Sequence, residues 1–279
     1  MTMQRFRLKD LGQVDRSKPL RFKFDGKFYE GYRGDTLASA LLANGVHLVG
    51  RSFKYHRPRG LLSAGAEEPN ALIQVGEGNS TDPNTRATQI ILRDGLTVKS
   101  QNRWPNLTFD LGYVNSLIHR LLPAGFYYKT FMWPASWWMR YEYWIRRAAG
   151  LGEAPKGADP DRYEKNHAHC DVLIVGSGPA GLSAALAAGQ TGARVILTEE
   201  QDSFGGSLTY NTDCTIDGLP AFEWVKRTVA ALSSMPEVIL LKTTVATGYY
   251  DHNYLTLLDT TDNGNQTGSE YKTRQRLWK

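Results

Sequence analysis

The chain has 279 residues, of which 41% are hydrophobic and 22% charged, and its formal net charge is +5 at pH 7. This composition is typical of a globular protein with enough residues for two domains. No run of 18 apolar residues occurs, so we expect no membrane-spanning helix, and no base-reading motif accompanies the basic residues, so we expect no nucleic-acid binding. Two cysteines are too few for a disulfide framework, which favours a cytoplasmic protein.

The first segment, residues 1–102, has the pattern of a small β-grasp domain. Apolar and polar residues alternate over residues 21–32 around Asp25-Gly26, a strong hairpin signal. A short helix is expected within residues 34–45, capped by Asp35 or Thr36 and closed by Asn44-Gly45. Three further strands are predicted, over residues 71–75, 88–93 and 96–100.

A basic loop follows the predicted helix, with the sequence RSFKYHRPRG over residues 51–60. Such a cluster could attract phosphates or an acidic partner. The alternative, a solvated basic loop, is favoured by the sequence alone.

The second segment, residues 103–168, is an aromatic connector and linker. Thirteen aromatic residues lie between Trp104 and Trp144, and they include five of the seven tryptophans. Short helices are expected, broken at Pro123 and Pro134. These side chains need a surface to bury against, either the flanking domains or another subunit. Residues 150–169 have the composition of a linker.

The third segment, residues 169–279, is predicted to be a Rossmann-type dinucleotide-binding domain. A buried parallel strand at residues 172–175 leads into Gly176, Gly178 and Gly181, which form the G-x-G-x-x-G pattern. The first glycine permits the tight turn, the second lets a pyrophosphate approach the backbone, and the third lets the following helix pack on the strand. The helix N-terminus favours negative charge.

A second strand ends in an acidic residue, Glu199, eighteen residues after Gly181. A carboxylate there can accept hydrogen bonds from an adenosine ribose, which favours NAD or FAD over NADP. The pair Gly205-Gly206 resembles the loop that covers the cofactor in two-dinucleotide flavoproteins, and Ser207 is a candidate phosphate or ribose contact.

Other candidate chemistry is weaker. His167, His169 and Cys170 could be metal ligands, but a structural role is favoured because no partner pair is evident. Cys214 has no second cysteine nearby, so we interpret it as packing. We therefore predict no metal site and name no catalytic residue.

Two features of a complete flavoprotein are missing before Lys279, a later strand ending in Ala-Thr-Gly and a terminal Gly-Asp. We therefore expect the dinucleotide domain to be cut off and the chain to be the N-terminal part of a longer polypeptide. The expected architecture is α/β, with an N-terminal α+β domain ahead of the incomplete Rossmann-type domain.

Three stretches together resemble the alpha subunits of heterotetrameric sarcosine oxidases: residues 51–76, residues 122–134 and residues 162–181. The resemblance implies a β-grasp domain similar to a [2Fe–2S] ferredoxin. Relatives with a cluster keep cysteines after a similar Pro-Arg-Gly, whereas residues 61–75 here contain none. Because such clusters need thiolate ligands, we expect a ferredoxin-like shell without an iron–sulfur cluster.

The resemblance also implies that the dinucleotide is NAD, with FAD as the alternative, while FAD and FMN serve the rest of the enzyme. The family often has an arginine where Gln201 stands, so this position departs from the pattern. The implied cofactor contacts are Gly176, Gly178, Pro179, Ala180, Gly181, Glu199, Glu200, Gln201, Ser207, Val245 and Ala246.

The first hypothesis is a part of the alpha subunit of a complex that oxidatively demethylates sarcosine to glycine with flavin and O2. The implied partners are beta, gamma and delta subunits, and tetrahydrofolate through a further C-terminal domain. The chain is not expected to be active alone. Alternatives are an FAD-binding subunit of an amino-acid or opine dehydrogenase, and a non-catalytic assembly subunit.

Overall fold

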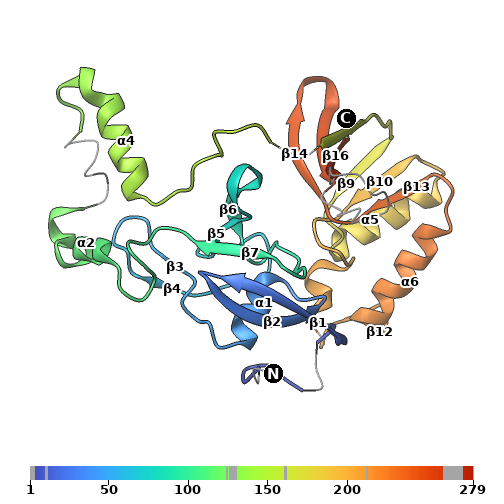
Figure 1. Ribbon diagram of the computed structural model, residues 1–279. Coiled ribbons are helices and arrows are strands. Elements are labelled where there is room, and N and C mark those ends of the chain that lie inside the picture. The colour runs from blue at the N-terminus through green and yellow to red at the C-terminus, as the bar shows by residue number, and fades with distance from the viewer. Residues whose placement is uncertain are drawn as a thin grey trace. The chain divides into compact units, whose positions relative to one another are not determined.

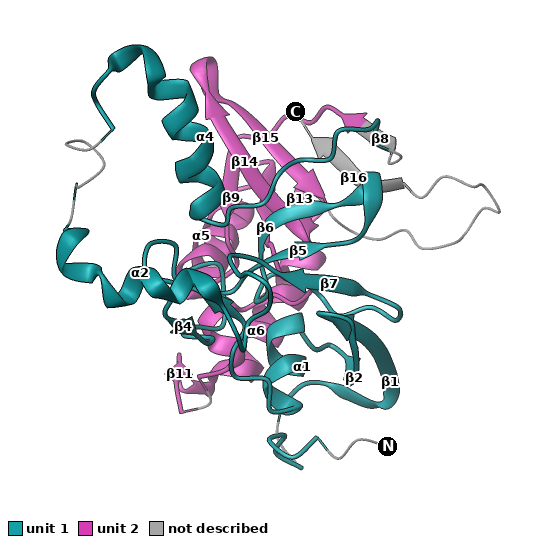
Figure 2. Ribbon diagram, turned by 60° about the vertical axis from the view of Figure 1, so that its left-hand side comes forward, with its two compact units in different colours: residues 1–159 teal, residues 160–279 magenta. Residues whose placement is uncertain are grey.

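The chain folds into two compact units, residues 1–159 and residues 160–279 (Figures 1 and 2). The structure is a computed structural model, and it describes residues 4–9, 12–123, 125, 131–159, 162–211, 213–259 and 273–278. The division into segments 1–102, 103–168 and 169–279 stays a prediction.

Unit 1 is built on a five-stranded mixed sheet with the strand order β2-β1-β7-β5-β6. β1 and β2 form an antiparallel hairpin, and β1 pairs in parallel with β7 at the centre. A separate two-stranded ladder, β3-β4, brackets the basic loop. The elements of this domain are β1 (Asp15–Phe24), β2 (Lys27–Arg33), α1 (Leu37–Ala43), β3 (Gly50–Arg51), β4 (Pro58–Arg59), β5 (Leu72–Val75), η1 (Gly78–Ser80), β6 (Asp82–Arg86) and β7 (Thr97–Ser100).

The predicted hairpin and helix are confirmed. Asp25 and Gly26 take positive φ angles of 47° and 84° in the turn, and the Thr36 side chain accepts the Ser39 N–H at the start of α1. One face of α1 joins the sheet in a continuous apolar core. Its buried members are Phe22, Phe24, Leu37, Ala38, Ala40, Leu41, Val49, Ala71, Ile73, Ala87, Ile90, Leu92, Val98 and Leu107.

The strand predicted over residues 88–93 is wrong. These residues form turns with one isolated bridge, between Ile91 and Thr36, and the strand lies earlier, as β6. Ile90 and Leu92 are buried although they are not in a strand, because they cap the core under α1. Residues 90–92 form a short apolar run, a pattern that a buried strand and a buried irregular segment share.

A buried carboxylate organises the loop between β4 and β5. Glu68 is fully buried, and its Oε2 accepts the backbone N–H groups of Leu62 and Ser63 at 2.7 and 2.8 Å. Its Oε1 accepts the N–H of Asn70 at 2.8 Å. Burial by itself raises the pKa of Glu68, but these hydrogen bonds outweigh burial and hold the pKa below its usual value of 4.5.

Replacing Glu68 by glutamine should lower the free energy of unfolding by about 2 kcal/mol at pH 7, because the amide NH2 would face a backbone donor. The folded-state pKa is lowered, so this stabilisation is complete above about pH 4.5 and is lost as the pH falls through the folded value. Urea denaturation of both proteins between pH 3 and pH 7 should show the difference shrinking below pH 4.5. A difference that grows on acidification would contradict this account.

The basic loop holds the aromatic connector through some of its residues, while Arg57 and Arg59 are exposed. Lys54 Nζ donates to the carbonyl oxygen of Pro123 at 2.8 Å. The Tyr55 hydroxyl donates to the carbonyl oxygen of Leu122 at 2.7 Å. Arg51 donates to the carbonyl oxygen of Leu107. Two basic side chains and one hydroxyl of the loop thus satisfy backbone carbonyl groups of the connector.

A buried histidine contacts both ends of the helical part of the connector, at Asp110 and at Ala148. His56 Nδ1 lies 2.6 Å from Oδ2 of Asp110, and its Nε2 lies 3.3 Å from the carbonyl oxygen of Ala148. Oδ1 of Asp110 accepts the backbone N–H groups of Trp104 and Gly112. His56 therefore fixes where the connector leaves the sheet and where it returns.

The described part of the connector forms short helices, as predicted, with one group ending before Pro123 and another beginning after Pro134. Most of its large apolar side chains are exposed, and α4 has no buried residue. The helices are η2 (Leu111–Tyr113), α2 (Val114–Leu117), η3 (His119–Leu121), η4 (Ala135–Trp137) and α4 (Trp138–Ala148).

Unit 2 contains a parallel three-stranded sheet in the order β13-β10-β9, with β10 in the middle. α5 and α6 supply one apolar layer on it, including Leu182, Ala185, Trp224 and Leu232. The strands and the helix predicted around the glycine pattern are confirmed as β9 (Val172–Val175), α5 (Pro179–Gln190) and β10 (Val195–Thr198). The prediction that β9 is buried is wrong, because β9 is an edge strand that is half-buried and exposes Val175. The other elements of this part are α6 (Ala221–Ser233) and β13 (Val238–Leu241).

A second sheet of unit 2 has the order β14-β15-β16-β8. β15 and β16 pair antiparallel. β8 lies within the segment predicted as a linker, and it pairs in parallel with β16. The remaining elements are β8 (Arg162–Asn166), η5 (Gly206–Thr209), β11 (Thr215–Ile216), β12 (Leu219–Pro220), β14 (Thr244–Tyr250), η6 (Asp251–Asn253), β15 (Tyr254–Asp259) and β16 (Thr273–Trp278).

Candidate dinucleotide-binding site

The three glycines between β9 and α5 meet different steric conditions. Gly176 has a φ of 91°, and its N–H donates to the carbonyl oxygen of Thr198. A Cβ atom on Gly181 would lie 2.0 Å from the carbonyl oxygen of Gly176, so this position requires glycine for packing. A Cβ atom on Gly178 would meet nothing within 4 Å. Gly178 therefore faces open space, where a ligand can approach the backbone.

α5 begins at this open space. Gly178 is its N-cap residue and Pro179 stands at the first helical position, where its missing N–H costs nothing. The first helical hydrogen bond runs from the Leu182 N–H to the Gly178 carbonyl oxygen. The N–H groups of Ala180 and Gly181 therefore have no partner within the helix, and an anion can accept from them.

Glu199, the predicted ribose acceptor, is buried at the end of β10. Its Oε2 accepts the N–H of Ser177 at 2.9 Å and the Ser177 hydroxyl at 2.5 Å. Its Oε1 accepts the N–H of Gln201 at 3.0 Å. Each carboxylate oxygen can accept a further hydrogen bond. Because the carboxylate is held beside the glycine turn, a ligand at the turn can donate that bond.

Ser177 is a structural member of the site that the sequence reasoning missed. It is fully buried, and its side-chain oxygen also accepts the N–H of Gly205 at 3.0 Å. Ser177 thus joins the glycine turn, the acidic residue and the Gly205-Gly206 loop. The position of Ser177 between the first two glycines of the motif could have indicated this role from the sequence.

The Gly205-Gly206 loop lies against the turn. Gly205 and Gly206 have φ angles of 125° and 51°, and a Cβ atom on Gly206 would lie 3.0 Å from the Cα of Gly178. Ser207 follows at the start of η5 and is exposed. The loop therefore brings Ser207 to the neighbourhood of the turn without burying its hydroxyl.

The other predicted contacts follow Glu199 in the chain or lie on β14, which is hydrogen-bonded to the Glu199 backbone. Glu200 and Gln201 are half-buried. The backbone N–H of Thr244 donates to the carbonyl oxygen of Glu199 at 2.8 Å. Val245 and Ala246 follow Thr244 on β14 and are half-buried.

The residues considered as metal ligands lie elsewhere in unit 2. His167, His169 and Cys170 line a cavity of about 320 Å³. Burial raises the pKa of the Cys170 thiol, and the charge of Asp171 adds to this, which keeps the sulfur protonated at neutral pH. Among the described residues, no group of three or more potential ligands is arranged to hold a metal ion.

The chain is similar in sequence to proteins of known name. The chain is 55% identical, over 99% of its length, to "Sarcosine oxidase subunit alpha" of Rhizobium meliloti (strain 1021). It is 35% identical, over 87% of its length, to the protein of the same name from Corynebacterium sp. (strain U-96). The chain is a relative of the sarcosine oxidase alpha subunits. It spans 28% of the length of the first relative and 21% of the second.

Two family models match separate parts of the chain. Residues 17–103 match a 2Fe-2S iron-sulfur cluster binding domain, and residues 171–272 match an FAD dependent oxidoreductase. The solved structure of L-proline dehydrogenase from P. horikoshii covers 99% of the chain with a TM-score of 0.54 at 19% identity, over 41% of its own length. This likeness concerns the fold.

The first match corrects the cofactor prediction. We predicted no iron–sulfur cluster, and residues 17–103 instead belong with cluster binding domains. The prediction relied on the absence of cysteines at the expected ligand positions, whereas the family match rests on the sequence of the whole segment. Cys170 and Cys214 lie outside the matched segment, which supplies no thiolate ligand. The residues present do not fit the cluster, and no step below depends on one.

NAD at the glycine turn receives no support from the second match, which names FAD. No helix within the described residues is long and apolar enough to cross a bilayer. The cytoplasmic location stays a prediction.

Proposed function

We propose that the chain is part of the alpha subunit of a sarcosine oxidase complex, and that unit 2 binds an adenine dinucleotide. The observation that carries the proposal is the open space at Gly178, between the α5 N-terminus and the buried carboxylate of Glu199. Its chemistry suits the ADP half that NAD and FAD share, since a pyrophosphate needs backbone donors and a ribose diol needs an acceptor.

In the proposed Rossmann-type site, the residues divide by role. The turn residues Gly176 and Gly178, with Pro179, Ala180 and Gly181 of α5, cradle the pyrophosphate. Glu199 accepts from the ribose. The remaining proposed contacts flank the adenosine or the covering loop: Glu200, Gln201, Ser207, Val245 and Ala246.

FAD is the dinucleotide that the match of residues 171–272 supports. A flavin held there would supply a hydride acceptor for an amine substrate and an electron donor for O2. This chain's own residues bind and orient the ADP half, and none of them is proposed as catalytic. NAD, which shares that half, is the competing ligand.

At the level of the whole complex, we propose the oxidation of sarcosine to glycine. Oxidation at the N-methyl group gives an imine, and its hydrolysis releases glycine and formaldehyde while O2 is reduced to H2O2. Tetrahydrofolate, where present, would take up the methyl carbon. The names of the relatives, "subunit alpha", support further subunits, which we propose to be beta, gamma and delta.

Titration of the purified full-length protein with FAD, NAD⁺ and NADP⁺, each followed by calorimetry, tests the dinucleotide site. We expect FAD or NAD⁺ to bind, with NADP⁺ at least about tenfold weaker than NAD⁺, because Glu199 repels a 2′-phosphate. A flavin absorption spectrum of the purified protein would identify FAD, rather than NAD⁺, as the bound dinucleotide. Equal affinity for NAD⁺ and NADP⁺, or binding of none of the three, would contradict the proposed site.

A further inference from the structure

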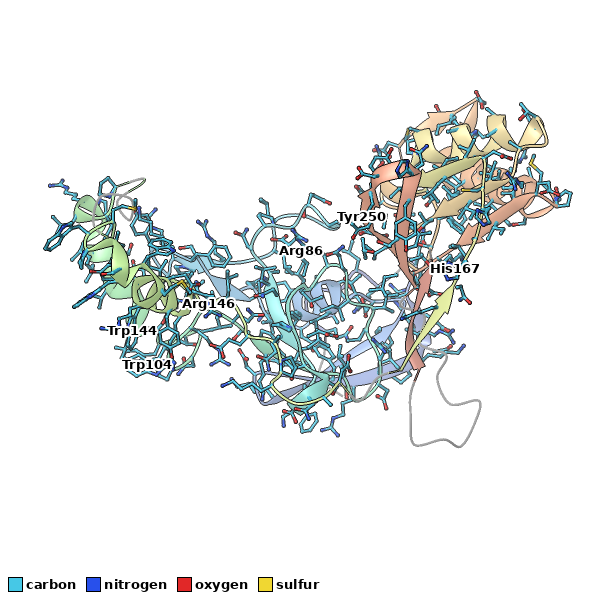
Figure 3. The ribbon with its side chains drawn as sticks, turned by 90° about the horizontal axis from the view of Figure 1, so that it is seen from above. Arg86, Trp104, Trp144, Arg146, His167 and Tyr250 are labelled. Atoms are coloured by element: carbon cyan, nitrogen blue, oxygen red, sulfur yellow. The ribbon has the colours of Figure 1, made fainter. Side chains whose placement is uncertain are left out.

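The connector presents an apolar surface that the described part of unit 1 leaves uncovered. We call this surface the aromatic face. Large apolar side chains rarely remain this exposed on a monomer without a function. Its most exposed members are Trp104 (67%), Leu117 (73%), Leu121 (77%), Trp133 (84%) and Trp144 (66%). Figures 1 and 3 place α2 and α4 at one end of unit 1, with Trp104, Trp144 and Arg146 far from Arg86 of β6.

The sequence of α4 separates two sides of the helix. Trp138, Tyr141, Trp144 and Ile145 recur at spacings of three and four, so they lie on one side. Arg140 and Arg147 are seven residues apart and lie on the other side. A helix with this pattern normally buries its apolar side, yet no α4 residue is buried in the described structure.

The composition of the aromatic face favours a protein partner. Residues 131–150 contain four tryptophans, two tyrosines, two methionines and three arginines, and they contain no lysine. Tryptophan, tyrosine, methionine and arginine are enriched in protein interfaces, whereas lysine is depleted there.

The charges around the aromatic face indicate what the partner carries. Arg140 stacks over the Trp137 ring at 5.3 Å, and Arg147 donates to the hydroxyl of Tyr143. α4 carries three arginines against a single acidic residue, Glu142. Two copies of this chain would bring like charges together, so the partner should carry acidic side chains around an apolar groove.

The anchoring of the connector gives the aromatic face a defined position. His56 contacts Asp110 before α2 and Ala148 at the end of α4, and Tyr55 holds Leu122 after η3. A surface held at both ends loses less conformational entropy on binding than a loose segment does.

We infer that the aromatic face docks another subunit of the complex, a folded protein that offers an apolar groove with a carboxylate rim. This inference rests on the proposed function, because it requires that the full-length protein assembles with other subunits.

The test compares complexes purified from the protein's own cells through a tagged full-length chain, weighed by native mass spectrometry. The variant Trp138→Ser/Tyr141→Ser/Trp144→Ser removes the apolar side of α4. The matched control, Met139→Ser/Phe222→Ser, removes exposed apolar groups from the opposite side of α4 and from α6. We expect the assembled fraction to fall at least about tenfold in the first variant and to stay within about twofold in the control.

A charge-reversal variant, Arg140→Glu/Arg147→Glu, should weaken assembly, and the loss should be smaller at high salt. Dinucleotide content and the thermal unfolding midpoint of each variant show whether the chain is still folded. Unchanged assembly of the apolar variant overturns the inference. The inference is also overturned if the wild-type chain self-associates and only the apolar variant abolishes that self-association. It is overturned as well if the wild-type chain sediments with vesicles of 3:1 phosphatidylcholine and phosphatidylglycerol, and the apolar variant abolishes this sedimentation while assembly persists. A wild-type chain that purifies alone contradicts the proposed complex itself.

Discussion

Replacing Gly178 by valine should weaken dinucleotide binding at least about 100-fold, a loss of about 2.7 kcal/mol. The reason is local: the new side chain would enter the open space above the turn, where the pyrophosphate is proposed to lie. Unit 2 should remain folded, because the φ of Gly178 is −63° and no neighbouring atom lies within 4 Å of the added Cβ. Calorimetric titration with FAD and NAD⁺ measures the binding, and thermal unfolding without ligand measures the fold.

Two controls separate binding from packing. Ala184→Val adds the same side chain at an exposed position of α5, and binding should stay within about twofold of the wild type. Gly181→Ala places a methyl group against the carbonyl oxygen of Gly176, so it should cost about 1–3 kcal/mol of unfolding free energy even without ligand. Undiminished binding by the Gly178→Val protein would show that the pyrophosphate does not lie at this turn.

Replacing Glu199 by glutamine should both destabilise unit 2 and weaken dinucleotide binding. The two carboxylate oxygens accept from Ser177 on one side and from Gln201 on the other. Glutamine has one carbonyl oxygen, so its NH2 group must face a donor on one of these sides. We expect a loss of about 2 kcal/mol in unfolding free energy without ligand and about tenfold weaker binding.

Glu237→Gln is the matched control, because it makes the same chemical change at an exposed site. Denaturant unfolding with and without saturating dinucleotide gives both quantities, since a ligand that binds the folded state raises apparent stability. A Glu199→Gln protein with wild-type stability and affinity would show that the carboxylate neither braces the turn nor meets the ribose.

The sequence predicted local structure well where short-range signals agree. Asp25-Gly26, the cap at Thr36 and the glycine pattern from Gly176 to Gly181 each depend on backbone geometry that few residues can adopt. Such signals act within a few residues, so they are readable without the fold. The strand placed over residues 88–93 failed because burial, rather than pairing, put Ile90 and Leu92 in the core.

Long-range contacts decided the rest. Ser177 became part of the site because it meets Glu199, 22 residues later, and Gly205, 28 residues later. The basic loop proved structural because its partners, Leu107, Leu122 and Pro123, lie more than 50 residues away. No local pattern encodes which carbonyl group a lysine or a tyrosine will meet.

By itself, the sequence determined a turn suited to a dinucleotide, a β-grasp hairpin and helix, and the resemblance to sarcosine oxidase alpha subunits. These follow from backbone restrictions and from residue order, which are properties of neighbouring positions. The tertiary structure decided that Glu68 is a buried brace, that Glu199 is held by the turn it serves, and that the tryptophans of the connector stay exposed. The physical reason is that burial and hydrogen-bond satisfaction depend on atoms brought together from distant parts of the chain.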